Sequence, residues 1–266
     1  MDTVDIVRSY YNSVVEEEWR RIDNMPEFLL TCRYIDRYIN PGDKVLDVGG
    51  GPGRYSLYLA EKGCDVTLFD LSDENVSFAA NIAAMSGLAI KAVQGDARVV
   101  DITLCDMYDH VLIMGPLYHL LEESDRIKSV NACLNLLKPG GTIFASFISS
   151  FSGVIYLMKN APEKLDSSPL ESEFVTTIVE DRPITGTVFT ENYFIRQRDV
   201  LPFMGRFQLD KLHFLGQEGV LSPCENNIVS QPKEVYDKWL DFSEKVCERE
   251  EYISWSEHFM YIGRKR

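Results

Sequence analysis

A short apolar run that leads into a cluster of glycines is the stretch of this sequence best suited to bind a ligand. The stretch from Val45 to Gly53 begins as a buried strand, and its glycines at 49, 51 and 53 have the G-x-G-x-G spacing. Glycine lets the backbone turn sharply and approach a ligand where a Cβ atom would collide. A dinucleotide fingerprint needs a glycine where this chain has Arg54, because a pyrophosphate must come close to the helix N-terminus. The loop therefore suits adenosine carrying a methionine tail, which has no phosphate, better than NAD.

The same stretch resembles the first motif of class I S-adenosylmethionine-dependent methyltransferases, and the similarity extends with gaps from about Pro41 to Phe147. In that family the loop wraps the methionine part of the cofactor, and an acid at the end of the second strand holds the ribose. The sequence Lys-Pro-Gly-Gly before an apolar strand, at 138–141, is a further feature of the family. The resemblance implies a methyltransferase with S-adenosylmethionine as its cofactor.

Asp70 is the expected ribose-binding acid. It ends the next apolar run, 23 residues after Asp47, near the offset at which a βαβ unit presents an acid to a ribose. Capping of the following helix is the alternative, although Ser72 already occupies the N-cap position. The resemblance further assigns an acid after the third strand, Asp96, to the adenine amine. The cofactor-binding residues that we expect are Asp47, Gly49, Gly50, Gly51, Gly53, Asp70, Leu71, Asp96, Ala97 and Met114.

A tyrosine and a histidine that follow the predicted fourth strand are the candidates for chemistry on the methyl acceptor. Methyl transfer is an in-line displacement that mainly needs donor and acceptor about 3 to 3.5 Å apart and shielded from water. A hydroxyl or protonated amine also needs a base, and His119, with an ordinary pKa of about 6.5, is placed to supply it. Tyr118 could orient the acceptor. The alternative is that the pair packs against a neighbouring insertion. His213 and His258 resemble strand residues at the far edge of the sheet and receive no role.

Composition limits the partners of the protein. The 266 residues carry a net charge of −14, which would repel a nucleic acid backbone. The six cysteines contain no C-x-x-C pair, which fits reduced thiols and predicts no metal site. The N-terminus does not resemble a signal peptide, and the longest uncharged apolar run, 111–117, is too short to cross a membrane. We expect a soluble cytoplasmic protein that acts on a small-molecule acceptor, without nucleic acid or membrane partners.

Strand and helix patterns position the candidate residues in an α/β fold. Apolar runs alternate with helical patterns up to residue 149, and two further strands are expected near the C-terminus. We expect a Rossmann-like, doubly wound, seven-stranded sheet, mostly parallel with one antiparallel strand. Ligands bind at the carboxyl ends of such strands, where the glycine loop, Asp70 and His119 fall. The expected strands are 45–48, 66–69, 91–94, 110–114, 142–148, 207–215 and 259–263.

The chain is expected to form a single methyltransferase domain over residues 1–266. Residues 1–39 would be an N-terminal cap of one or two amphipathic helices, and residues 40–149 the cofactor-binding core. Residues 150–200 would be a lid insertion, with a helix at 153–160 and a β-like run at 185–195. Residues 201–266 would hold the last strands and helix of the core. Tyr11 either packs the cap or covers the cofactor.

Two other functions use the same sheet. A nicotinamide-dependent oxidoreductase is disfavoured by Arg54, and a non-catalytic cofactor-binding or scaffold protein is the second alternative, because fold does not imply function.

Overall fold

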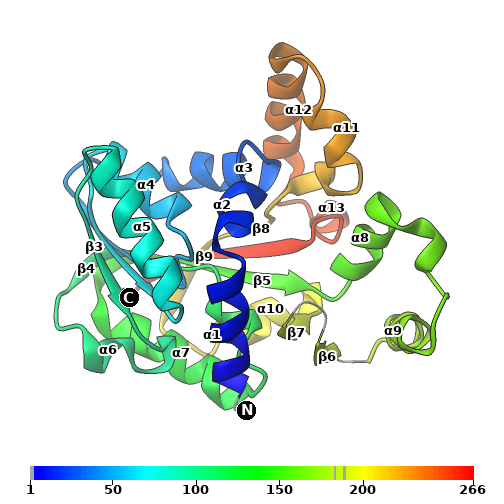
Figure 1. Ribbon diagram of the computed structural model, residues 1–266, viewed down its shortest axis with the longest axis horizontal. Coiled ribbons are helices and arrows are strands. Elements are labelled where there is room, and N and C mark those ends of the chain that lie inside the picture. Colours follow the sequence, from blue (N-terminus) through cyan, green and yellow to red (C-terminus); the bar gives the residue numbers. More distant parts are fainter. Residues whose placement is uncertain (1–2, 183, 188–189) are drawn as a thin grey trace.

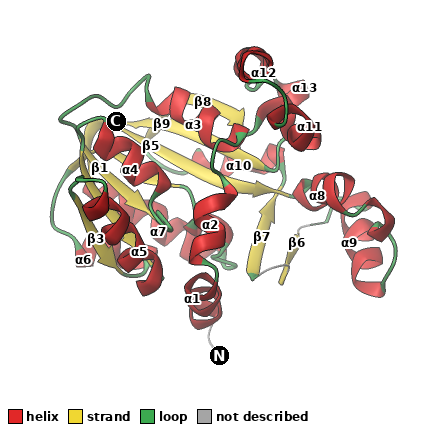
Figure 2. Ribbon diagram, turned by 45° about the horizontal axis from the view of Figure 1, so that its top comes forward, coloured by secondary structure: helices red, strands yellow, loops and turns green. Residues whose placement is uncertain are grey.

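The computed structural model describes residues 3–182, 184–187 and 190–266. Its centre is a sheet whose first five strands pair in the order β3-β2-β1-β4-β5, with every neighbour parallel (Figures 1 and 2). The chain leaves β1 in one direction and returns to β4 on its other side, which opens a crevice beyond the ends of β1 and β4. These strands are β1 (Lys44–Val48), β2 (Asp65–Asp70), β3 (Ile90–Gln94), β4 (Tyr108–Ile113) and β5 (Leu137–Ser149).

Helices cover both faces of the sheet, as the doubly wound prediction requires. One buried cluster joins the sheet to the helices after β3 and β4, through Val100, Val130 and Cys133. A second cluster on the other face contains Tyr34 and Leu59 from helices before and after β1. The helices of the core are α4 (Arg54–Glu61), α5 (Asp73–Met85), α6 (Val100–Thr103) and α7 (Glu123–Leu136).

The sheet has nine strands among the described residues, and the predicted number of seven is wrong. Strand β9 (His258–Lys265) runs antiparallel between β5 and β8 (Leu209–Gly216), as expected for the one antiparallel strand of the core. The two additional strands are a hairpin of β6 (Ile184–Thr187) and β7 (Glu191–Ile195) within the insertion. Strand β7 pairs with the last two residues of β5, 148 and 149, which lie beyond the β4 pairing. Residues 188 and 189 of the predicted β-like run lie outside the described residues.

Residues 3–39 of the N-terminal cap contain three helices, where one or two were predicted for the cap. They are α1 (Thr3–Ser13), α2 (Val15–Arg21) and α3 (Pro26–Ile35). Asn24 adopts a left-handed φ of 58° and Pro26 begins α3, so the chain turns sharply between the second and third helix. Helices α1 and α2 run between α5 and the insertion (Figure 1).

The remaining helices belong to the insertion and the C-terminal segment. Helices α8 (Ser152–Asn160) and α9 (Pro169–Val179) lie at one side of the molecule, away from the centre of the sheet (Figures 1 and 2). The chain then continues through α10 (Gln197–Met204), α11 (Glu225–Val229), α12 (Lys233–Val246) and α13 (Glu250–Ile253). None of the helices within the described ranges is long and apolar enough to cross a membrane. The six cysteines are free thiols.

A buried polar bridge fastens the cap to the sheet. The Gln217 side chain, 2% exposed, accepts a hydrogen bond from the Ser146 hydroxyl of β5 at 2.8 Å. Its amide donates to the Thr31 hydroxyl of α3 at 3.0 Å. Because all three side chains are buried, the loss of the central one would leave two hydroxyls without their partner.

We therefore predict that Gln217→Ala lowers the free energy of unfolding by on the order of 2 kcal/mol. Denaturant titration of the wild type and the variant measures this difference. Gln208→Ala is the control, since Gln208 is exposed and the same truncation there leaves no buried hydroxyl stranded. Equal losses in the two variants would contradict the structural role of the bridge.

Candidate functional site

A cavity of about 660 Å³ opens at the carboxyl ends of the central strands. Its walls come from the glycine loop, from α1 and α2 of the cap, from the segment after β4 and from the start of β9. This volume is in the range of pockets that hold small molecules. Most of the predicted site residues line it: Asp47, Gly49, Gly50, Gly51, Asp70, Leu71, Asp96, Ala97, Met114, Tyr118 and His119. Gly53, which was also predicted to bind the cofactor, does not line it.

The three spaced glycines of the loop share a left-handed backbone but serve different purposes. Gly49 has a φ of 71°, and a Cβ there would lie 2.4 Å from Pro116. Gly53 has a φ of 93°, and its Cβ would lie 2.9 Å from that of Ala79 on α5. Gly51 has a φ of 54°, but its Cβ would meet no protein atom within 4 Å. Two glycines thus allow the chain to pack, and Gly51 keeps space open on the cavity side.

Asp47 is buried beneath the loop. Its Oδ2 accepts a hydrogen bond from the Ser56 hydroxyl of α4 at 2.7 Å. A Cβ on Gly50 would lie 2.8 Å from the same oxygen, so glycine is required there for packing as well. Burial raises the pKa of Asp47 to about 6, although the Ser56 hydroxyl opposes the shift. The side chain therefore holds the start of α4 against β1 and contributes to the floor of the cavity.

Asp70 joins the end of β2 to the glycine loop. Its Oδ2 accepts the Gly51 amide at 2.8 Å, and its Oδ1 accepts the Ser72 amide at 2.9 Å. The Ser72 hydroxyl accepts the Asn75 amide at 3.0 Å, so Ser72 is the N-cap of α5, as the sequence indicated. Burial raises the pKa of Asp70 against these hydrogen bonds. Asp70 holds the loop in shape, and its binding of a ribose stays a prediction.

Asp96 has a cationic partner on the cavity wall. Its Oδ2 lies 2.6 Å from Nη2 of Arg98, and Nη1 of Arg98 lies 2.8 Å from Asp125. Burial acts against ionisation, but the hydrogen bonds from Arg98 lower the pKa of Asp96 below its usual range. The carboxylate is therefore ionised and held in a fixed orientation at neutral pH. Its contact with an adenine amine stays a prediction.

His119 is buried at the place where the cap meets the insertion. Its Nε2 lies 2.7 Å from the Tyr11 hydroxyl of α1, and its Nδ1 lies 3.1 Å from the carbonyl oxygen of Glu191 on β7. A carbonyl only accepts, so Nδ1 carries the proton and Nε2 accepts from Tyr11. Burial lowers the pKa of His119 to about 4, although the Glu191 carbonyl favours the charged form. A ring with this pKa and with hydrogen bonds at both nitrogens suits a structural contact, and its role as base stays a prediction.

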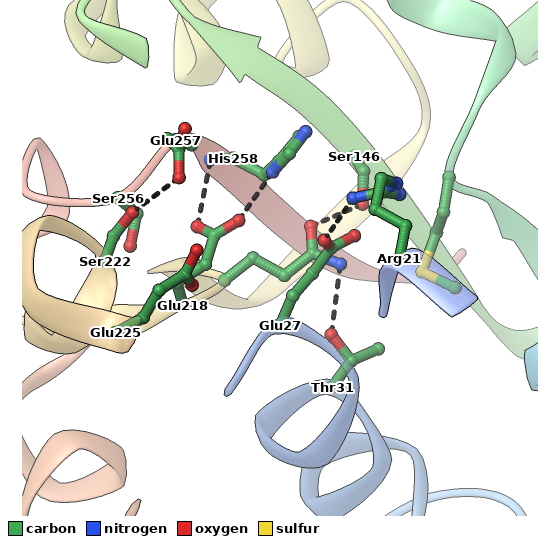
Figure 3. Close-up of polar contacts among 12 residues, drawn as sticks. Arg21, Glu27, Thr31, Ser146, Glu218, Ser222, Glu225, Ser256, Glu257 and His258 are labelled. Carbon is green, nitrogen blue, oxygen red and sulfur yellow. Dashed lines mark hydrogen bonds and ion pairs between the residues drawn. The ribbon is translucent and has the colours of Figure 1, made fainter. Parts of the chain in front are cut away.

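A histidine to which the sequence assigned no role also lines the cavity. His258 is the first residue of β9, and its Nδ1 lies 2.5 Å from Oε1 of Glu218 (Figure 3). Burial lowers the pKa of this ring, but the charges of Glu218 and Glu27 outweigh burial and raise it to about 9. The expectation that His258 stands at the far edge of the sheet, away from the site, is thus wrong. Antiparallel β9 begins where β5 ends, which brings the first residue of β9 to the ligand edge.

Ion pairs surround His258 at this end of the cavity. Arg21 of α2 lies 2.8 Å from Glu27 of α3 and 3.0 Å from Glu18. Glu27, Glu218 and His258 bring their polar atoms within 4.8 Å of one another, a spacing that a metal ion could use. Arg21 and His258 already neutralise the two carboxylates, however, which favours ion pairs over a metal. Because these residues come from three separated parts of the chain, residues 18–27, Glu218 and His258, no local motif could have indicated them.

The strand order, the glycine loop and the acid at the end of β2 together define the class I methyltransferase fold. Solved structures share it. Magnesium protoporphyrin IX methyltransferase from Synechocystis superposes with a TM-score of 0.57 at 16% identity, over 100% of both chains. An S-adenosylmethionine-dependent methyltransferase from Clostridium acetobutylicum gives a TM-score of 0.56 at 14% identity, over 89% of both chains. At these identities the similarity concerns the fold alone.

Sequence comparison identifies the family. Residues 45–141 match the family described as a methyltransferase domain. The ubiquinone biosynthesis O-methyltransferase of Shewanella halifaxensis is 32% identical over 157 residues, which are 55% of this chain and 64% of that protein. The protein of the same name from Pectobacterium carotovorum is 31% identical over 159 residues, 51% and 65% of the two chains. The match thus spans a little under two thirds of these relatives. Residues 45–141 thus carry a methyltransferase domain, and this part of the chain is similar to class I S-adenosylmethionine-dependent methyltransferases.

The buried state of His119 predicts a loss of stability in acid. In the unfolded chain its pKa is near 6.5, and in the folded protein it is about 4, so the unfolded state binds more protons between these values. The stability that the neutral ring contributes is present above pH 6.5 and is lost as the pH falls towards 4, by on the order of 3 kcal/mol. His119→Gln retains a donor and an acceptor but does not titrate. Denaturant unfolding between pH 7 and 4.5 should therefore show a steeper loss for the wild type, and parallel curves would contradict the prediction.

Proposed function

We propose that this chain transfers a methyl group from S-adenosylmethionine to a hydroxyl group of a small molecule. One observation carries the proposal: a single cavity of about 660 Å³ extends from the glycine loop to the ion pairs around His258, which leaves room for a donor and an acceptor side by side. The family supports methyl transfer, and the curated relatives named O-methyltransferases support oxygen as the accepting atom.

The residues at the loop fit the cofactor. When bound, S-adenosylmethionine supplies a methyl group made electrophilic by a sulfonium sulfur. The open space at Gly51 would accept its methionine part, because only there in the loop does a missing Cβ face no protein atom. Asp70 and Leu71 would hold the ribose, and Asp96 with Ala97 would hold the adenine. Asp47, Gly50 and Met114 would line the same pocket.

The acceptor would lie between the cap and the insertion. Tyr11 of the cap, Tyr156 of the insertion and Tyr118 of the segment after β4 line the cavity and offer surfaces for a small aromatic or aliphatic molecule. Residues 150–200 would act as a lid within one domain of 266 residues, so that the chain contributes mainly proximity and exclusion of water. The net charge of −14 argues against a nucleic acid acceptor, and we propose a cytoplasmic location without a membrane partner.

Arg54 bears on the oxidoreductase alternative. Its Nε donates to the backbone oxygen of Trp19 at 2.7 Å, and its guanidinium lies 3.6 Å from the centre of the Trp19 ring. The side chain thus fastens α2 over the loop at the position where a dinucleotide fingerprint needs a glycine. This arrangement supports a ligand without a pyrophosphate.

The cofactor assignment predicts that Gly51→Ala weakens binding of S-adenosylhomocysteine by about tenfold or more, because the new methyl group occupies ligand space. Calorimetry measures the affinity, and NAD should not bind. Gly87→Ala is the matched control: Gly87 has a φ of 68°, its Cβ would meet no atom within 4 Å, and it does not line the cavity. Both substitutions introduce similar backbone strain. An equal affinity of the two variants for S-adenosylhomocysteine would therefore refute the assignment of the loop.

The activity itself predicts transfer of labelled methyl groups to pools of small phenols and other hydroxyl compounds. The label should appear on oxygen, and Gly51→Ala should lower the rate more than Gly87→Ala does. Pools of amines, thiols and carboxylates show whether another atom is preferred. Binding of S-adenosylhomocysteine without transfer to any pool would favour the non-catalytic alternative.

A further inference from the structure

The geometry at the start of β9 assigns a base to this site. We propose that His258, held by Glu218, takes the proton from the hydroxyl of the acceptor, so that His258 rather than His119 is the catalytic residue. The inference rests on the proposed methyl transfer to oxygen and adds to it the residue that prepares the accepting atom.

Glu218 contacts both the ring and the backbone amide of His258. Its Oε1 lies 2.5 Å from Nδ1 of the ring, and its Oε2 accepts the backbone amide of His258 at 3.0 Å. Glu218 is only 2% exposed, so the carboxylate has little contact with water that would weaken the pair. A carboxylate at Nδ1 keeps the proton on that nitrogen and leaves Nε2 as the reactive atom. Glu218 is therefore a positioning residue for His258.

The second ring nitrogen of His258 is available to a ligand. Nε2 makes no hydrogen bond with any residue in the described part of the chain, and the ring lines the cavity. Figure 3 shows this nitrogen on the side of the ring that points away from Glu218. Tyr118 lies between the two histidines, with its ring centre 4.7 Å from His119 and 6.2 Å from His258. An acceptor beside Tyr118 could thus reach Nε2.

The charged groups around the ring favour its protonated form. Glu218 from the segment after β8, and Glu27 from α3, add negative charge, while Arg21 from α2 opposes them. Glu257, the preceding residue, is paired with Lys159 of α8 at 2.5 Å. Burial lowers the pKa of His258, but the two carboxylates outweigh it and raise the pKa to about 9. A phenol has a pKa of about 10, so proton transfer between the two groups is nearly balanced. His119, with a pKa of about 4, offers no such match.

The proposed proton transfer conserves charge. The neutral ring and the neutral hydroxyl form an imidazolium and an oxyanion: the O–H bond breaks, both of its electrons stay on oxygen, and an N–H bond forms at Nε2. Glu218 neutralises the imidazolium, which in turn stabilises the oxyanion beside it. At neutral pH the resting ring carries a proton, and that proton leaves to solvent before or as the acceptor binds. The oxyanion of the resulting ion pair can then act as the nucleophile toward an electrophilic carbon.

A phenol with a visible ionised form tests this step without turnover. 4-Nitrophenol is titrated into the complex of the protein with S-adenosylhomocysteine, and its phenolate absorption is followed against pH. For the wild type we expect the ionisation constant of the bound probe to exceed that of the free probe by about tenfold or more. His258→Gln should abolish this increase. Glu218→Gln should make this increase in the ionisation constant smaller. The increase should also disappear at a lower pH than in the wild type, because the His258 ring loses its counter-charge and gives up its proton more easily.

Matched controls separate this role from a structural one. His213→Gln removes another histidine paired with a glutamate, Glu248 at 2.9 Å, but His213 does not line the cavity, so the probe should ionise as in the wild type. His119→Gln tests the other candidate base, and its effect on the ionisation should be smaller than that of His258→Gln. Each variant must bind S-adenosylhomocysteine as the wild type does. If a variant does not fold, NMR of the wild type decides: the probe should shift the Cε1 resonance of His258 and not that of His213.

The outcomes distinguish this inference from the proposed function. A wild-type protein that does not bind S-adenosylhomocysteine refutes the function. If it binds but the probe fails to bind, ionises as in free solution, or behaves alike in the wild type and His258→Gln, the assignment of His258 is wrong. If only His119→Gln abolishes the increase in the ionisation constant of the bound probe, His119 is the base.

Discussion

The hydrogen bond from the Gly51 amide to the Asp70 carboxylate links the two strand ends on which the site depends. It connects the loop after β1 to the end of β2 at 2.8 Å, beside the crevice where the strand order reverses. The left-handed backbone at Gly51 presents the amide to this carboxylate, and the absence of a Cβ leaves the cavity open above it. An acid and a glycine at this spacing therefore shape the pocket.

The walls of the cavity depend on contacts between segments that are distant in sequence. The Tyr11–His119–Glu191 chain of hydrogen bonds joins α1, the segment after β4 and β7. Arg54 fastens α2 over the loop through Trp19. These contacts bring the cap and the insertion together at the ligand edge of the sheet.

The two histidines of the cavity show how environment separates their chemistry. His119 has a backbone carbonyl and a tyrosine as neighbours, and burial lowers its pKa to about 4. His258 is partly buried, but Glu218 contacts it directly, and its pKa rises to about 9. Burial disfavours the charged form in both cases, and only a nearby carboxylate can outweigh that cost. The two environments therefore move the pKa values of the two rings in opposite directions.

Local patterns determined the central part of this protein. The apolar runs, the glycine spacing and the position of Asp70 indicated the core sheet, the ligand edge and the kind of cofactor, because each depends on residues close together in the chain. The pairing of β7 with the end of β5 and the meeting of Arg21, Glu27, Glu218 and His258 depended on the tertiary structure. The sequence of a strand indicates which of its residues are buried, but not which strand it pairs with. An ion pair between distant residues leaves no periodic pattern in the sequence of either segment. The sequence by itself thus determined where the ligand edge of the sheet lies, and the folded chain decided which distant side chains line the cavity there.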